Sequence, residues 1–335
     1  MDLGPKVREL FHELAGQDTS RNSRLMNQAA DSLLAVRASG LVKRYGQLVA
    51  VDGLDLDIPS GQFFGLLGPN GSGKTSTIHM LATLIRPSGG SARVAGHDVV
   101  GEAVKVRGAI GLVFQDSALD RSLTVAENLR FAGLLYNLTP AIIRERSAEL
   151  LELFGLTDKI NRPVGSLSGG MRRALDIMRG MIHHPRILFL DEPTIGLDLP
   201  NRRNIWRFIE RLRARTGMTV LLTTHYLEEA DSCDRVAFIK SGKLVQSGPP
   251  RELVKSLGRH IVEIECRDID ALSQQLAAKL GPCLKDGEVA QFRYAEEDVT
   301  PLARLQGELG AQIKALRWRR PNLNDVFLWI AEGKI

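Results

Sequence analysis

The chain has 335 residues, of which 44% are hydrophobic and 25% are charged, and its formal net charge is +5. This length and composition predict a globular protein of two or three domains, and no apolar run approaches the roughly 18 residues needed to cross a bilayer. The charged start lacks the apolar core of a signal peptide, which predicts a cytoplasmic protein. The mild, dispersed positive charge favours a solvated surface over a nucleic-acid partner, and the three widely spaced cysteines favour reduced thiols over disulfides or a zinc site.

The chain divides into three predicted segments, and the first two differ clearly in pattern. Residues 1–36 form an extension whose apolar residues recur at helical spacing, so we expect a short amphipathic helix over 5–15. Residues 37–258 contain strand-like runs separated by Gly and Pro, and residues 118–183 within them are mostly helical. This pattern predicts an α/β domain with a mixed sheet core and a helical subdomain. The predicted strands include 48–58, 62–68, 109–115, 186–192, 219–225 and 235–240.

Residues 259–335 form the third segment, a small α+β domain to which we assign an accessory or regulatory role. Strand, helix, hairpin, helix and strand patterns follow one another here, with the hairpin turning at Asp286–Gly287. The resulting β-α-β-β-α-β order predicts a ferredoxin-like fold. A last helix carries an apolar stripe, which we expect to pack on this domain's own sheet; the alternative is that part of it, with Trp329, touches a partner subunit. The stripe consists of Leu323, Val326, Phe327 and Ile330.

The clearest chemical motif is GPNGSGKT at 68–75, between an apolar run and a predicted helix. Glycines allow successive backbone amides to turn inward around an anion, and the helix that follows offers unpaired N–H groups. Lys74 is placed to reach the β- and γ-phosphates, and the Thr75 hydroxyl to bind Mg²⁺. The motif therefore predicts a phosphate loop for a nucleotide. The residues assigned to it are Gly68, Pro69, Asn70, Gly71, Ser72, Gly73, Lys74, Thr75 and the adjoining Ser76.

Polar residues stand at the ends of three further apolar strands, although each one alone is compatible with a plain strand terminus. Asp191 is predicted to hold Mg²⁺, and the adjacent Glu192 to polarise the attacking water. Gln115 is predicted to complete the Mg²⁺ shell, and His225 to orient Glu192 and the water. Ligands bind at the carboxyl edge of an open α/β sheet, so these residues should meet the phosphate loop there. Tyr45 is a candidate for stacking on adenine.

A second glycine motif, LSGGM at 167–171, precedes the strand that carries the acidic pair. Ser168, Gly169 and Gly170 place small residues and amides at a predicted helix N-terminus, which again suits phosphate. A simple P-loop enzyme has no use for a second phosphate-binding loop.

With these motifs the sequence resembles the ATP-binding-cassette (ABC) family over roughly 37–258. The phosphate loop, the glutamine, LSGGM, ILFLDEP, GLD at 196–198 and the histidine occur in the family's order. The stretch RPVGSLSGGMRRALDI and the tail PNLNDVFLWIAEG most resemble ATPase subunits of ABC-2-type, daunorubicin-resistance-type exporters. Met171 departs from the glutamine common after LSGG, and the N-terminal extension is not part of the pattern.

The resemblance implies a head-to-tail dimer, as a homodimer or with a paralogous subunit, that buries two ATP molecules with Mg²⁺. Ser168, Gly169 and Gly170 of one subunit would close over the γ-phosphate held by the other, and Asp198 would couple the two sites. Glu192 would act as general base, with His225 as its partner and Lys74 offsetting charge on the phosphoryl group. Separate transmembrane permease subunits would dock near Gln115 and 118–140, so the chain would be peripheral on the inner face of the membrane.

Two other functions compete with a transporter ATPase: a soluble cassette ATPase acting on DNA or ribosomes, and a switch in which ATP only controls binding. Chromosome-type members insert long coiled coils between the two halves of the cassette, but only 53 positions separate Gln115 from Ser168. Translation-type members carry two cassettes, and this chain carries one. Glu192 argues against a switch that does not hydrolyse ATP. The permease subunits would select the transported substrate.

Overall fold

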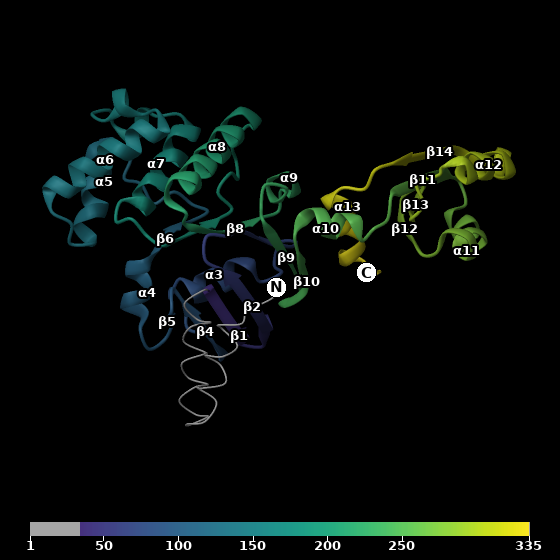
Figure 1. The fold of residues 1–335 in the computed structure, drawn as a ribbon, viewed down its shortest axis with the longest axis horizontal. Helices are drawn as coiled ribbons and strands as arrows, with labels where there is room; N and C mark the ends of the chain where they lie inside the picture. Colours follow the sequence, from purple (N-terminus) through teal and green to yellow (C-terminus); the bar gives the residue numbers. More distant parts are fainter. Residues whose placement is uncertain (1–33, 335) are drawn as a thin grey trace, which may run out of the picture.

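The computed structural model describes residues 34–334, so the predicted helix over 5–15 lies outside the described residues. A six-stranded sheet forms the centre of the larger domain, in the order β10-β9-β3-β8-β7-β6 (Figure 1). Its inner strands pair in parallel, and only β10 runs antiparallel to its neighbour β9. Every residue of β3, β7 and β8 is buried, as expected for strands covered on both faces. The strands are β3 (Phe63–Leu67), β6 (Ile110–Val113), β7 (Ile187–Asp191), β8 (Thr219–Thr224), β9 (Arg235–Lys240) and β10 (Lys243–Gly248).

A second, antiparallel sheet in the order β2-β1-β4-β5 covers one side of the central sheet. Phe64, Leu66 and Ile78 pack with apolar residues of this sheet in one buried cluster, which places helix α3 between the two sheets. Strand β1 begins at Leu34 and so includes the last residues that the sequence pattern assigns to the extension. The elements are β1 (Leu34–Tyr45), β2 (Leu48–Pro59), α3 (Lys74–Leu81), β4 (Gly89–Val94), β5 (His97–Asp98) and α4 (Ala103–Ala109).

A helical layer lies on the other side, as the sequence predicts for 118–183. Helix α5 starts with a capping box in which the Thr124 and Glu127 side chains each accept the other's backbone N–H. Helix α6 has Pro140 at its first turn and ends at Gly155, whose φ of +65° suits glycine. No helix within residues 34–334 has the length and apolarity to span a membrane. The helices are α5 (Val125–Leu135), α6 (Pro140–Phe154), α7 (Gly169–Met181), α8 (Leu199–Thr216) and α9 (Leu227–Ala230).

The C-terminal domain has the predicted β-α-β-β-α-β order. Its antiparallel sheet is arranged β12-β13-β11-β14, with α11 and α12 on one face, and the hairpin turns between Asp286 and Val289. Val262, Ile264 and Phe292 lie in its separate core. The ferredoxin-like prediction is therefore confirmed by the strand order. The elements are α10 (Pro250–Lys255), which leads into this domain, β11 (His260–Cys266), α11 (Ile269–Leu280), β12 (Cys283–Asp286), β13 (Val289–Tyr294), α12 (Thr300–Leu309) and β14 (Ile313–Arg319).

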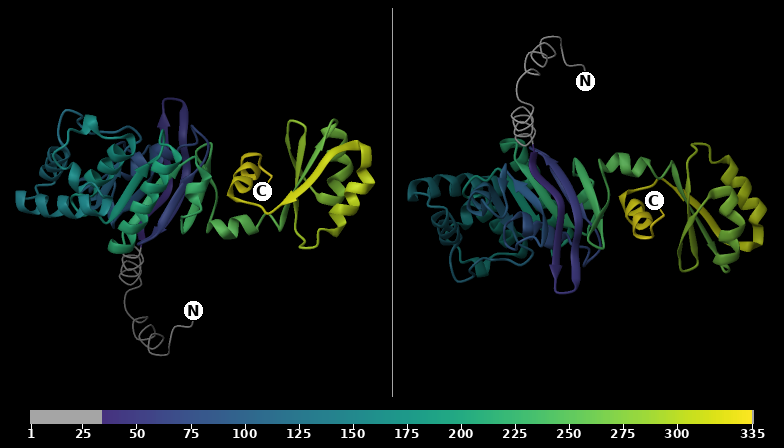
Figure 2. Two further views of the ribbon diagram at one scale, coloured as in Figure 1. Left: turned by 90° about the horizontal axis from the view of Figure 1, so that it is seen from above. Right: turned by 90° about the horizontal axis from the view of Figure 1, so that it is seen from below.

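The last helix, α13 (Leu323–Ala331), lies between the larger domain and the C-terminal sheet (Figure 2). The sequence pattern predicted that its apolar stripe packs on the sheet of the C-terminal domain. The stripe also packs against the larger domain. Phe327 packs against Phe238 of β9, with ring centroids 6.2 Å apart, and the fully buried Trp329 belongs to the main core of the larger domain. Local periodicity identifies an apolar face but not its partner. Helix α13 therefore ties the two domains together.

Candidate functional site

The phosphate loop runs from the end of β3 to the start of α3, and two of its glycines are required by close backbone contacts. A Cβ atom on Gly68 would lie 2.3 Å from the carbonyl oxygen of Ile239, and one on Gly73 would lie 2.3 Å from the carbonyl oxygen of Ala50. Both also have positive φ, +158° and +109°. The loop is thus held in a conformation that brings its backbone amides to the N-terminus of α3, where an anion binds well.

Lys74 is buried at the first position of α3, and its ammonium lies inside the loop. Nζ donates to the carbonyl oxygens of Gly68 at 2.9 Å and Pro69 at 3.2 Å. Burial lowers the pKa of Lys74, whereas the nearby carboxylates of Glu192 and Asp191 oppose that shift. A desolvated cation held by carbonyl dipoles is poised to exchange them for phosphate oxygens.

Asp191, at the end of β7, is 2% exposed and lies beside Thr75. The Thr75 hydroxyl donates to Asp191 Oδ1 at 3.3 Å, so the two predicted Mg²⁺ ligands meet at one point. Two further residues that the motifs did not predict orient this carboxylate. Thr223 Oγ1 donates to Oδ1 at 2.6 Å, and His79 Nε2 lies 3.8 Å from Oδ2. A hydroxyl and a carboxylate beside a phosphate loop are hard oxygen donors, which fit Mg²⁺.

Glu192 and His225 come from neighbouring strands and are paired as predicted. His225 Nδ1 lies 3.2 Å from Glu192 Oε2. Glu192 has a positive φ of +46°, and its backbone N–H donates to the Thr223 hydroxyl at 3.0 Å, which fixes this strained conformation. Glu229, four residues after His225, is buried, and its carboxylate accepts hydrogen bonds from Thr224 Oγ1 at 2.6 Å and from the Thr194 hydroxyl. These bonds join the segment after β7 to the end of β8 and to α9.

Tyr45 and Gln115 lie at the rim of this site. The Tyr45 ring is 47% exposed, and its hydroxyl lies 3.5 Å from Ser76 Oγ at the start of α3, beside the phosphate loop. Gln115 is exposed just beyond β6, and within residues 34–334 its side chain makes no hydrogen bond to Thr75 or Asp191. Its assignment as a Mg²⁺ ligand therefore stays a prediction.

The second glycine loop opens α7 in the helical layer, away from the phosphate loop. Ser168 caps α7 by accepting from the Met171 N–H at 3.3 Å, and the backbone of Gly169 starts the helix. A Cβ on Gly170 would lie 2.2 Å from Asn201 Oδ1 in the first turn of α8. Asp198 caps α8 through the Asn201 N–H at 2.9 Å. The LSGG loop and Asp198 are thus packed together within one chain, with no hydrogen bond to the phosphate loop in the part that the structure describes.

Arg173 of α7 is a further residue that the motifs did not assign to the site. Its buried guanidinium donates to the carbonyl oxygens of Pro193 at 2.5 Å, Glu192 at 3.1 Å and Phe114 at 2.6 Å. Burial lowers its pKa, and the carboxylates of Asp176 and Asp191 oppose that shift. Its position two residues after LSGGM was the only available signal. Arg173 therefore links α7 to the backbone of Glu192 and Pro193 and to the residue that follows β6.

Replacing Arg173 with Met should destabilise the larger domain by about 2–3 kcal/mol, because several buried carbonyls would lose their donor. Urea unfolding followed by circular dichroism measures this loss. The matched control is Arg144→Met on α6. This substitution makes the same change of shape and charge at an exposed arginine. Equal midpoints for the two variants would contradict the linking role.

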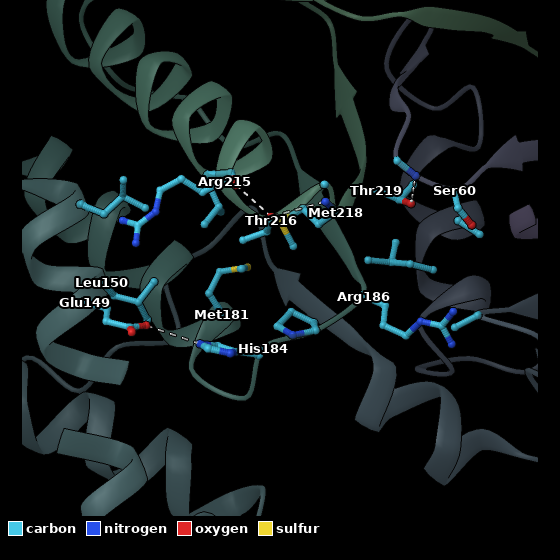
Figure 3. Close-up of a pocket in the computed structure, with 18 of the residues that line it drawn as sticks. Ser60, Glu149, Leu150, Met181, His184, Arg186, Arg215, Thr216, Met218 and Thr219 are labelled. Atoms are coloured by element: carbon cyan, nitrogen blue, oxygen red, sulfur yellow. Dashed lines mark hydrogen bonds and ion pairs between the residues drawn. The ribbon is translucent and has the colours of Figure 1, made fainter. Parts of the chain in front are cut away.

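A cavity of about 500 Å³ lies at the opposite, amino-terminal edge of the central sheet (Figure 3). Leu150, Met181 and Met218 contribute to its apolar walls, and Glu149 and His184 face each other on one side of it. None of the predicted site residues lines it. The predicted nucleotide-site residues lie instead at the carboxyl edge, where the phosphate loop, Asp191, Glu192 and His225 meet.

These features define a class of protein: a P-loop ATPase of the cassette type, with the LSGG loop on a separate helical layer. Residues 51–195 match the family model described as ABC transporter. The chain is 42% identical to the daunorubicin/doxorubicin resistance ATP-binding protein DrrA of Streptomyces peucetius, over 88% of this chain and 91% of that protein. The chain therefore belongs to the ABC transporter family, and it is an ATP-hydrolysing subunit of such a transporter.

Other relatives and solved structures agree with this assignment. The chain is 41% identical to the Nod factor export ATP-binding protein I of Ralstonia nicotianae, over 86% of this chain and 91% of that protein. Its fold matches cbiO1 of Clostridium perfringens with a TM-score of 0.62, 24% identity, and coverage of 74% of this chain and 96% of that chain. It also matches a dimeric, post-hydrolysis ATP-binding cassette bound to ADP and Pi, with a TM-score of 0.58, 26% identity, and coverage of 64% and 98%.

Proposed function

We propose that the protein drives export through separate permease subunits, by closing a head-to-tail dimer on MgATP and reopening it after hydrolysis. The dimer is inferred from the separation of the phosphate loop from the LSGG loop within one chain. A second phosphate-binding loop that does not reach the first one is explained if it completes the site of a partner. The solved cassette dimer with ADP and Pi supports this arrangement. The names of the resistance and Nod-factor relatives support export of a drug, lipid or polysaccharide-like compound.

In this mechanism Glu192 takes a proton from the attacking water. His225 is its partner, since its Nδ1 lies 3.2 Å from a Glu192 oxygen and can hold the carboxylate in position. Lys74 offsets the charge that develops on the phosphoryl group. Thr75 and Asp191, with Gln115, would hold Mg²⁺, which when bound neutralises phosphate charge. The buried Glu229 and Arg173 fix the backbone that carries these groups.

The dimer can be tested by cross-linking, because the chain's own cysteines are all buried. In a Glu192→Gln background, Asn70→Cys and Ser168→Cys place one thiol on each loop. With MgATP and a short bismaleimide, we expect a covalent dimer on a denaturing gel. Each single-cysteine variant serves as the control and should remain monomeric. A double variant that stays monomeric with MgATP would contradict the head-to-tail dimer.

Helix α5 carries an exposed apolar surface that supports permease docking there. Phe131 is 59% exposed, Leu134 48% and Leu135 67%, and the neighbouring Tyr136 is 37% exposed. These residues form an exposed apolar patch within the segment 118–140 that was assigned to docking. Exposed apolar residues gathered at one place are typical of interaction sites. The patch lies on the helix that follows the Gln115 segment in the chain, so a permease helix seated on it would contact the helical layer.

Replacing Phe131 with Asp should release the protein from its permease subunits without changing its fold. The substitution places a charge in the centre of the exposed patch, where a buried contact would then cost several kcal/mol. Co-purification from detergent-solubilised membranes measures the association, and a melting curve checks the fold. Val104→Asp on α4 is the matched control, since Val104 is 75% exposed and lies outside the patch. Equal recovery of permease with both variants would argue against docking at α5.

A further inference from the structure

A second pocket, of about 940 Å³, lies where the larger domain meets the C-terminal domain. One wall comes from the end of α10 and the residues after it, 254–259. The other walls come from 280–282 after α11, from the end of β13 and from 320–321 before α13. None of the residues assigned to ATP or Mg²⁺ lines this pocket. It is therefore separate from the nucleotide site.

Among residues 34–334, the charged residues that line this pocket are all cationic: Lys255, Arg259, Arg293 and Arg320. Glu297, which does not line it, pairs with Arg259 at 3.3 Å and with Arg320 at 2.5 Å. Within residues 34–334, neither Lys255 nor Arg293 has a carboxylate within salt-bridge distance. One carboxylate for four cations leaves a local excess of positive charge.

Arg293 is the least exposed of the four cations. It projects from β13 and is half-buried, with its guanidinium 4.8 Å from the centre of the Trp329 ring. A cation–π contact does not need to consume the N–H donors of the guanidinium, so they can serve another group. A half-buried cation without a carboxylate gains more from an anion than a fully solvated one, because part of its hydration is already lost.

The rest of the lining is largely apolar and includes Val254, Leu257, Leu280 and Pro282. The volume lies within the range of about 300–1,000 Å³ that is typical of small-molecule sites. We propose that this pocket binds an amphipathic anion, with its anionic head on Arg293 and Lys255 and its apolar body against Val254, Leu257 and Leu280. This site goes beyond the proposed transport function and does not depend on it.

Such a ligand would contact both domains at once. Lys255 and Val254 belong to α10 of the larger domain, whereas Arg293 and Leu280 belong to the C-terminal domain. A molecule that binds only when both walls are in place stabilises that arrangement of the domains. The pocket would thereby let an amphipathic anion control how the C-terminal domain sits on the ATPase domain.

The test uses the full chain saturated with MgADP, so that the phosphate loop is filled. The probe is anilinonaphthalene sulfonate, which has an aromatic body and one sulfonate, and its fluorescence rises in an apolar site. We expect one saturable site that dodecanoate, an aliphatic carboxylate, displaces. Replacing Arg293 and Lys255 with Gln together should weaken probe binding about tenfold or more, because both charged donors are lost.

The matched control is Arg251→Gln with Arg304→Gln, which removes one exposed cation from α10 and one from the C-terminal domain but none from the pocket. Ala295→Phe is a second pocket variant that keeps all four cations and fills the space, and it should also weaken binding about tenfold. Melting curves establish that each variant is folded. Absence of a saturable site, equal losses in the pocket and control pairs, or unchanged binding by Ala295→Phe would each overturn the proposal.

Discussion

Replacing Glu192 with Gln is expected to slow ATP hydrolysis by roughly 10²- to 10⁴-fold, the usual contribution of a general base. ATP binding should be retained, since the phosphate loop is unchanged and the amide keeps the shape of the carboxylate. The protein should then accumulate as an ATP-bound dimer on a sizing column. Steady-state phosphate release and equilibrium nucleotide binding measure the two effects separately.

The matched control is Glu228→Gln, since Glu228 is an exposed acid three residues after His225. It makes the same change of charge close to the site and should hydrolyse ATP at the normal rate. If Glu192→Gln also turned over at a near-normal rate, the base would have to be another group. His225 would then lose its role as well, because its position is argued from its 3.2 Å contact with Glu192.

Replacing Lys74 with Ala is expected to weaken MgATP binding by about 10- to 100-fold. A hydrogen bond to a charged group is worth about 1.5–3 kcal/mol, and Lys74 is the cation that lies inside the phosphate loop. Titration with a fluorescent ATP analogue measures the dissociation constant. The loss should appear in binding itself, unlike the effect of Glu192→Gln, which should appear in turnover.

Lys105→Ala on α4 provides the control for Lys74, because it removes an exposed lysine that pairs with Glu102 at the surface. Its nucleotide affinity should equal that of the unchanged protein. Unchanged affinity of Lys74→Ala would contradict the assignment of 68–75 as the phosphate cradle. A melting curve is needed for this variant, because Lys74 is buried and also binds the carbonyl oxygens of Gly68 and Pro69.

Much of the fold could be predicted because its signals are local. An apolar strand, a glycine loop and a helix follow one another within 63–81, so the phosphate loop was readable from neighbouring residues. The C-terminal order was readable for the same reason, since each strand and helix has its own periodicity. The prediction of an ATP-hydrolysing transporter subunit, made from the motifs and their order, is confirmed by the relatives.

What the local pattern could not determine is which distant segments touch. His79 carries no motif and joins the site only because α3 lies beside the end of β7. Arg173 reaches the carbonyl oxygens of Phe114 and Pro193, 59 and 20 residues away along the chain. The apolar stripe of α13 was evident in the sequence, but its packing against Phe238 was not.

The sequence by itself thus determined the kind of chemistry: the phosphate loop, the acidic pair with its histidine, the signature loop and the order of elements around them. These depend on residue type and short spacing, which sterics and backbone hydrogen bonding convert directly into local structure. Only the tertiary structure decided which residues support that chemistry, where α13 lies, and that Lys255 and Arg293 line one pocket. Side-chain contacts between distant segments depend on how whole elements pack, and packing minimises the free energy of the entire core and not of any one segment.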